Sequence, residues 1–253
     1  MCLIGLRYKT LPGIPFLLLA NRDEYFRRKS LAAAPWAENP RIIGGRDSET
    51  LGSWMALNQN GRFAAVTNVR TGQRPAPDSR SRGALVKDFV SGTESTLEFA
   101  QRLRDECGQF APFNLLFGQV DDLYCFHSPR HTLTRLTHGT YGLSNGRLDE
   151  PWPKVQQLKE ALNEFKRYPP EQTFFDLLSD DTAPPVTSLP NTGVGTAQER
   201  FLAPVFIHGS DYGTRASTVL TINARGEAQL IEQSWHSGRA LGRVKLNLRL
   251  SAG

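Results

Sequence analysis

The chain begins with MCLIGLRYKTLPGIPFLLLANRDE, residues 1–24, and this stretch decides how the fold is interpreted. Residues 1–8 and 15–20 are apolar runs of strand length, and Pro12-Gly13 between them is a turn signal. We therefore predict a β-hairpin at the start of the chain. If its strands pair, the tetrad Asn21–Glu24 at the end of the second strand lies close to Cys2 in space.

Cys2 directly follows the initiator methionine, and a small residue at this position favours removal of Met1. Removal leaves a cysteine that carries both a thiol and a free α-amine. The α-amine has an ordinary pKa of about 7.7–8.0, so it can act as a base near neutral pH. Nucleophile and base then sit on one residue. The alternative is that Cys2 is a small apolar residue of the first strand, because free cysteines are usually buried and inert.

The composition is that of a soluble globular protein, with 39% hydrophobic and 22% charged residues among 253. We expect one domain over residues 1–253. No apolar run approaches the roughly 20 residues that cross a bilayer, so membrane insertion is not expected. The start of the chain lacks the pattern of a secretory signal, which makes a cytoplasmic location the expectation.

The charged and metal-binding residue types exclude several classes of site. The net charge is +5, but the arginines are dispersed and no basic helix with interleaved aromatics occurs, so nucleic acid is not an expected partner. Three cysteines form neither a disulfide framework nor a zinc pattern, and the five histidines are scattered. We expect no metal, no required cofactor, and a small-molecule ligand or substrate as the partner; the oligomeric state is left open.

Hydrophobic periodicity predicts strands, a helix pair, strands, a second helix pair and final strands. This order disfavours a doubly wound parallel sheet and favours an α+β fold of two antiparallel sheets, each covered by one helix pair. We expect residues 25–50 to be irregular and residues 180–200 to be a mobile loop. The expected helices are 83–90, 96–107, 151–168 and 172–178, and the expected strands after the first hairpin are 54–57, 63–67, 113–118, 123–127, 132–137, 141–143, 205–208, 217–222, 228–234 and 244–250.

Several motifs occur in one order along nearly the whole chain, and together they resemble the Transport and Golgi organisation 2 family, also called NRDE. They are Met1-Cys2, Asn21–Glu24, Gly44–Asp47, Gly52–Trp54, Thr67–Arg70, Phe113–Leu116, Gly142–Asn145 and Tyr212–Thr218. The family is similar to the N-terminal nucleophile hydrolases of the penicillin V acylase and bile salt hydrolase branch. The resemblance implies a four-layer α/β/β/α sandwich and a Cys2-dependent hydrolase of a linear, non-peptide amide.

The same resemblance assigns roles to five residues. Cys2 matches the nucleophile and Asp23 the acid that holds the α-amine, while Asn68 matches an oxyanion donor. Asn145 matches a second polar contact and Arg215 a late arginine. The branch has an arginine three positions before its aspartate, where this sequence has Ala20.

The residues themselves leave alternatives open. Asp23 and Asn68 are also common types at strand ends, and Arg215 suits either a contact with Asp23, a bound anion or a structural ion pair. Trp54 is a core residue or a ligand platform. Arg22 and Arg70 are further candidates for substrate binding. The resemblance also implies a non-catalytic alternative, in which the cleft binds haem as cargo or an acyl-CoA or lipid.

Overall fold

Two antiparallel β-sheets face each other in the computed structural model, which describes residues 2–73 and 76–251 apart from the side chain of Cys2. The first sheet has the order β10-β1-β2-β11-β12-β13 and the second β3-β4-β5-β6-β7-β8-β9. The first comprises β10 (Gly139–Leu143), β1 (Cys2–Leu11), β2 (Ile14–Tyr25), β11 (Tyr212–Ile222), β12 (Glu227–His236) and β13 (Arg239–Arg249). The second comprises β3 (Ser30–Trp36), β4 (Asn39–Asp47), β5 (Met55–Asn58), β6 (Arg62–Asn68), β7 (Phe113–Gln119), β8 (Asp122–His127) and β9 (Thr132–Arg135).

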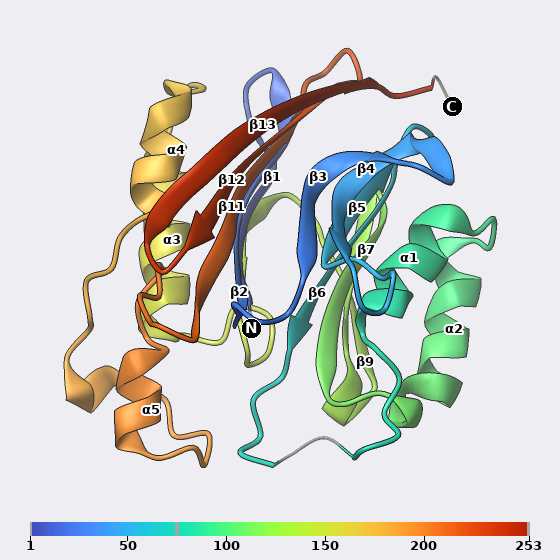
Figure 1. Cartoon of the computed structure of the whole chain (residues 1–253). Coiled ribbons are helices and arrows are strands. Elements are labelled where there is room, and N and C mark those ends of the chain that lie inside the picture. The colour runs from blue at the N-terminus through green and yellow to red at the C-terminus, as the bar shows by residue number, and fades with distance from the viewer. Residues whose placement is uncertain (1, 74–75, 252–253) are drawn as a thin grey trace.

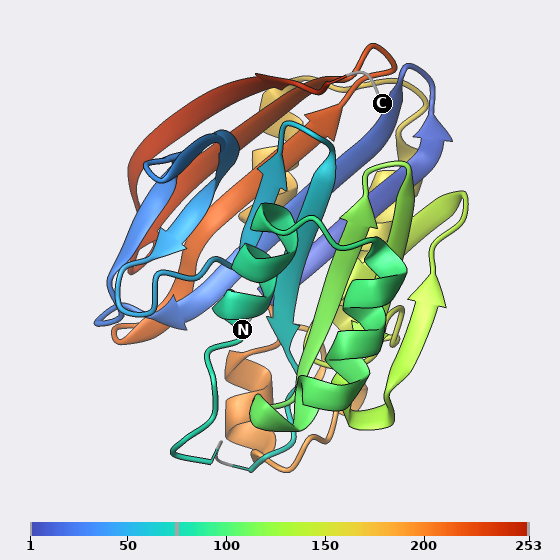
Figure 2. The same cartoon turned by 90° about the vertical axis from the view of Figure 1, so that its right-hand side faces the viewer.

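Helices cover the outer faces of both sheets (Figure 1). The pair α1 (Gly83–Ser91) and α2 (Thr96–Glu106) lies across the second sheet, as Figure 2 shows in green. The pair α3 (Pro153–Glu164) and α4 (Glu171–Leu178) lies on the first sheet, and α5 (Thr196–Phe201) sits at one end of the sandwich. This arrangement confirms the predicted α/β/β/α sandwich. No helix in the described part of the chain is long and apolar enough to span a membrane.

Alternation along the strands divides the apolar residues among three layers of core. On β1, Ile4 and Leu6 belong to the cluster between the sheets, whereas Leu3 belongs to the cluster under α3 and α4. A third cluster, which contains Phe89, joins the second sheet to α1 and α2. Each sheet is therefore apolar on both faces, because one face meets the other sheet and the other meets helices.

The first hairpin forms as predicted, and its register sets up the site. Cys2 pairs with Arg22 and Leu3 with Asn21, so the end of β2 lies beside the start of β1. The helices also begin near their predicted positions. Ser95 and Glu98 form the predicted capping box of α2, with reciprocal hydrogen bonds of 3.2 and 2.8 Å.

Three local predictions are wrong. Residues 25–50 are not irregular, because they contain β3 and β4 with bulges in their pairing. Residues 205–208 form no strand. Ile207 is held by Thr214 instead: its N–H donates to Thr214 Oγ1, and its carbonyl oxygen accepts from the Thr214 N–H, both at 2.9 Å. The 180–200 segment is not a loop throughout, because it contains all of α5 except Phe201, and Glu199 of this helix forms a buried ion pair.

Candidate active site

The end of β2 lies between β1 and β11, so Asn21 and Arg22 pair on both sides, whereas Asp23 and Glu24 pair with β11. Asp23 is 1% exposed, and its Oδ1 accepts a hydrogen bond of 2.8 Å from Thr214 Oγ1 on β11. Burial raises the pKa of this carboxyl group, while the positive charge of Lys154 and the bond from Thr214 oppose the rise. Asp23, the acid predicted from the sequence, is therefore buried, and it directly follows Arg22, the residue that pairs with Cys2.

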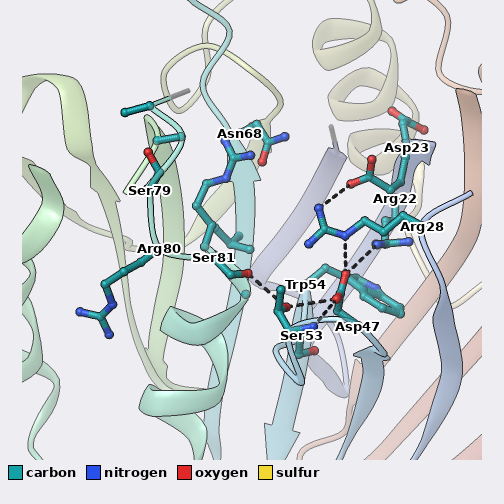
Figure 3. Close-up of a pocket in the computed structure, with 17 residues that line it drawn as sticks. Arg22, Asp23, Arg28, Asp47, Ser53, Trp54, Asn68, Ser79, Arg80 and Ser81 are labelled. Atoms are coloured by element: carbon teal, nitrogen blue, oxygen red, sulfur yellow. Dashed lines mark hydrogen bonds and ion pairs between the residues drawn. The ribbon is translucent and has the colours of Figure 1, made fainter. Parts of the chain in front are cut away.

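A cleft of about 340 Å³ opens beside Asp23, and we call it the first lobe (Figure 3). Residues of β2 and β4, with Arg28 from the turn after β2, form one wall, which we call the β2–β4 wall, and the segment 79–83 before and at the start of α1 forms the opposite wall. Trp54 and Asn68 also line it. A second lobe of about 670 Å³ adjoins the first, because the two share Asn68 and Arg82 among their lining residues.

Charged side chains on the β2–β4 wall bind one another. Arg28 Nε donates to Asp47 Oδ2 at 2.5 Å, and Arg22 Nη2 lies 3.9 Å from the same oxygen. The Arg22 guanidinium also stacks on the ring of Trp54, with Cζ 4.4 Å from the ring centroid. Burial alone raises the pKa of Asp47, but the bond and charge of Arg28 together with the hydrogen bonds from Thr50 outweigh burial and leave that pKa below its ordinary value. Arg22 and Trp54, both predicted to bind substrate, thus line the cleft as one stacked pair.

Asn145 holds the main chain of Asn68 in place by a hydrogen bond. Asn145 Nδ2 donates to the main-chain oxygen of Asn68 at 2.9 Å, and the main-chain oxygen of Asn145 accepts from the Arg70 N–H at 2.8 Å. Asn145 is fully buried, whereas Asn68 lines both lobes. The two predicted asparagines therefore lie together, with Asn68 at the cleft and Asn145 as the residue that fixes the end of β6.

The other two predicted arginines lie in contacts within the protein. Arg70 forms a buried ion pair with Glu199 through its Nη1, and its Cζ lies 5.1 Å from the ring centroid of Trp152. Arg215 donates through Nη1 to the carbonyl oxygens of Tyr25, at 3.1 Å, and of Arg28. Arg215 thus holds the turn between β2 and β3, and Asp23 takes its β11 contact from Thr214 instead.

Two residues of the site carried no signal in the sequence. Lys154, at the start of α3, is 3% exposed, donates from Nζ to the carbonyl oxygen of Leu202 at 2.9 Å, and is foremost among the charges that favour ionised Asp23. Arg82 lies in an unremarkable Ser-Arg-Ser-Arg run and lines both lobes. Met1 and the side chain of Cys2 lie outside the described residues, so the assignment of the nucleophile stays a prediction.

Comparisons with solved structures support the fold. The chain superposes on the C2A mutant of conjugated bile acid hydrolase from Clostridium perfringens with a TM-score of 0.52 and 8% identity, over 96% of this chain and 92% of that one. The R18L variant of the same hydrolase gives a TM-score of 0.50 and 9% identity over 99% of each chain. At this identity the likeness shows a sandwich of the N-terminal nucleophile hydrolase type and nothing about activity.

Sequence comparisons identify the family. The mouse Transport and Golgi organization 2 homolog is 28% identical over 92% of this chain and 93% of its own length. The human homologue is also 28% identical with the same coverage, and the Drosophila melanogaster protein is 26% identical over 88% of this chain and 87% of its own. The family model of Transport and Golgi organisation 2 matches residues 1–237. This chain belongs to the Transport and Golgi organisation 2 family.

Proposed function

We propose that this protein is an N-terminal cysteine hydrolase that cleaves a linear, non-peptide amide after removal of Met1. The observation that carries the proposal is the β1–β2 register, which pairs the backbone of Cys2 with Arg22, one residue from the buried Asp23. Asn68, at the end of the facing strand β6, lines the cleft that adjoins these residues. The predicted nucleophile, acid and oxyanion donor thus come from three strands that end near one cleft.

The chemistry follows the logic of an N-terminal nucleophile. The thiol of Cys2 transfers its proton to the α-amine, and the thiolate attacks the amide carbonyl carbon. Asp23 holds the resulting ammonium group, and Asn68 stabilises the oxyanion, a contribution of about 3 kcal/mol in other enzymes. The ammonium then gives a proton to the leaving amine as the C–N bond breaks. Water hydrolyses the thioester, which releases a carboxylic acid and restores the thiol.

Lys154 has a defined part in this scheme. Burial favours the neutral form of Asp23, which cannot hold an ammonium group by charge. The buried ammonium of Lys154 opposes that effect and favours the carboxylate. Lys154 therefore acts as a positioning residue through Asp23, and activity is expected to fall as the pH drops through the raised pKa of Asp23.

The test begins with the intact mass of untagged protein before and after a brief iodoacetamide pulse at neutral pH. We expect the loss of one methionine and one fast-reacting thiol that maps to Cys2. Cys107 and Cys125 serve as internal controls, because burial raises the pKa of both thiols, that of Cys125 to about 12. Retained Met1 together with an unreactive Cys2 contradicts the proposal. A panel of amides then follows, and turnover that is unchanged in Cys2→Ala also refutes it.

A further inference from the structure

A second cavity, of about 400 Å³, lies apart from the cleft, because it shares no lining residue with either lobe. Residues of β8 and β9 and Arg130 from the 3₁₀ turn between them form one side of it. The segment 147–151, which leads from β10 toward α3, forms the other side. The volume is in the range of small-molecule sites. The chemistry proposed for the cleft does not use any side chain of this cavity.

The β8–β9 register gathers four side chains of the cavity on one face. Cys125 pairs with Thr134, and His127 pairs with Thr132. Successive residues of a strand point to opposite faces, so these four side chains share a face of the ladder. Cys125 belongs to the apolar cluster between the sheets, which shows that this face is the inner one. His127 is therefore an inward-facing imidazole, and it is 8% exposed.

Asn114 on the adjacent strand β7 fixes the tautomer of His127. The Asn114 side chain is fully buried, and its Nδ2 lies 2.8 Å from the carbonyl oxygen of Gly146 and 3.4 Å from that of Ser144. Carbonyl oxygens only accept hydrogen bonds, so the amide nitrogen faces them and Oδ1 faces His127 Nδ1, at 2.7 Å. Nδ1 of His127 therefore carries the proton, and Nε2 of the neutral ring is an acceptor.

The Nε2 atom of His127 is available to a ligand. Within residues 2–73 and 76–251, the Asn114 amide is the only group that hydrogen-bonds to this ring. Nε2 is not a fully buried atom, so it opens onto the cavity that His127 lines. Burial and the charges of Arg130 and Arg147 lower the pKa of His127, with Glu150 opposing them only in part. The ring is thus predominantly neutral at pH 7, and its free lone pair suits an O–H or N–H donor.

The charged groups around the ring favour an anion over a cation. Asp149 Oδ1 accepts from Lys159 Nζ at 2.7 Å, so this carboxylate is engaged outside the cavity. Glu150 Oε2 accepts from the Arg147 N–H at 2.7 Å and lies 3.6 Å from Arg147 Nε. Arg130 is exposed and has no ion pair with any residue that the structure describes. One unpaired guanidinium matches a single negative charge, whereas Asp149 and Glu150 would repel a dianion such as a phosphate monoester.

From these contacts we infer that the cavity binds a small hydroxy carboxylic acid. The hydroxyl group of the ligand donates to His127 Nε2, and its carboxylate binds Arg130, which lies three residues further along the chain. Leu148 and Pro151 line the same cavity and give apolar surface for the remainder of the ligand. This site is independent of the proposed function, because none of its residues lines the cleft.

Three matched probes test the site by calorimetric titration at pH 7. Mandelate carries a hydroxyl group, a carboxylate and an apolar ring, whereas phenylacetate lacks only the hydroxyl group and mandelamide lacks only the charge. We expect phenylacetate and mandelamide each to bind about fivefold or more weakly than mandelate, because each leaves one polar group of the cavity without its partner. In protein labelled with ¹⁵N at histidine, mandelate should shift the resonance of His127 Nε2, which locates the binding at this ring.

Two variants should each abolish one of these preferences. His127→Phe keeps a ring but removes the acceptor, so mandelate and phenylacetate should bind equally well. Arg130→Gln removes the charge, so mandelate and mandelamide should bind equally well; because Arg130 is exposed, this variant keeps the site testable should His127→Phe not fold. Arg135→Gln is the matched control, since Arg135 lies on β9 on the face opposite Thr134 and donates to Asp122 at 2.7 Å. It should change each affinity by no more than about twofold.

Several outcomes would overturn the site. They are equal affinities of wild type for mandelate and either matched probe, an Nε2 resonance that saturating mandelate leaves in place, and equal effects of Arg130→Gln and Arg135→Gln. A preference for mandelate over phenylacetate that survives in His127→Phe would also overturn it, as would no binding of mandelate up to about 10 mM. None of these results bears on the proposed function, which the thiol of Cys2 tests separately.

Discussion

Glu232 is a buried carboxyl group between the two sheets, and it makes the stability of the fold depend on pH. It lies on β12 and is 2% exposed. Its Oε1 accepts a hydrogen bond of 2.7 Å from the Ala33 N–H on β3, in the other sheet, and its Oε2 lies 3.3 Å from Thr218 Oγ1. Burial raises its pKa from 4.5 to about 7, against the effect of both hydrogen bonds and of Arg22.

Replacement of Glu232 by glutamine removes this titration and preserves most of the shape. The folded state holds the Glu232 proton more tightly than the unfolded state does, so the contribution of Glu232 to the free energy of unfolding is fully present below pH 4.5 and is lost as the pH rises through about 7. A shift from 4.5 to about 7 corresponds to about 3 kcal/mol at 1.36 kcal/mol per unit. Glu232→Gln is therefore expected to exceed the stability of wild type by less than about 1 kcal/mol near pH 5 and by up to about 3 kcal/mol near pH 8.

Urea unfolding at several pH values between about 5 and 8 measures the difference. The amide oxygen of the Glu232→Gln variant can still accept from the Ala33 N–H, and the Thr218 hydroxyl can turn to accept from the new amide. Glu227→Gln on the same strand is the control, because that carboxylate is exposed and its pairing with Arg249 is at the surface. It should shift the free energy of unfolding by less than about 1 kcal/mol at every pH. Parallel curves for wild type and Glu232→Gln would refute the reasoning.

Two further substitutions test contacts that shape the cleft. Arg70→Met leaves Glu199 buried without its counter-ion and should lower the free energy of unfolding by about 3–5 kcal/mol, with faster proteolysis near α5. Adding Glu199→Gln should restore much of this loss. Equal stability of the single and double variants would contradict the ion pair. Gly45→Ala puts a methyl group 1.9 Å from Trp54 Cζ2, so the indole must move and its fluorescence should shift. Gly108→Ala is the control: nothing lies within 4 Å of the added methyl group, so the fluorescence spectrum should not change.

The parts of the fold that the sequence predicts well are those with a clean periodic pattern. The first hairpin, the helix pairs and the two-sheet architecture follow from apolar runs, turn signals and a capping box. The β3–β4 hairpin does not, because Pro35 and Gly44-Gly45 suggest a loop. In the structure Gly44 lies where an added Cβ would be 2.4 Å from the Met55 carbonyl oxygen, so this glycine permits close strand packing instead of a turn.

The candidate site is predictable in part for a similar reason. Asp23 and Asn68 stand at strand ends, where alternation and the hairpin register bring them toward the same cleft. Lys154 and Arg82 come from the starts of helices on opposite faces of the sandwich. Periodicity predicts which side of a helix is buried, but it does not predict which strand end the first turn of that helix approaches. Residues that reach a site from the helical layers are therefore missed.

The arrangement at Arg215 shows how a single inserted residue decides the electrostatics of Asp23. Ala216 pairs with Arg22, so a regular ladder would put Arg215 opposite Asp23. A bulge between Thr214 and Ala216 leaves Arg215 unpaired in the ladder and brings Thr214 opposite Asp23 instead. The aspartate thus receives a neutral hydroxyl from β11, and the guanidinium holds the carbonyl groups of the β2–β3 turn. Burial raises the pKa of Asp23 and its β11 partner is a neutral hydroxyl, so the charge of Lys154, and not that of Arg215, is the largest of the effects that favour the ionised form.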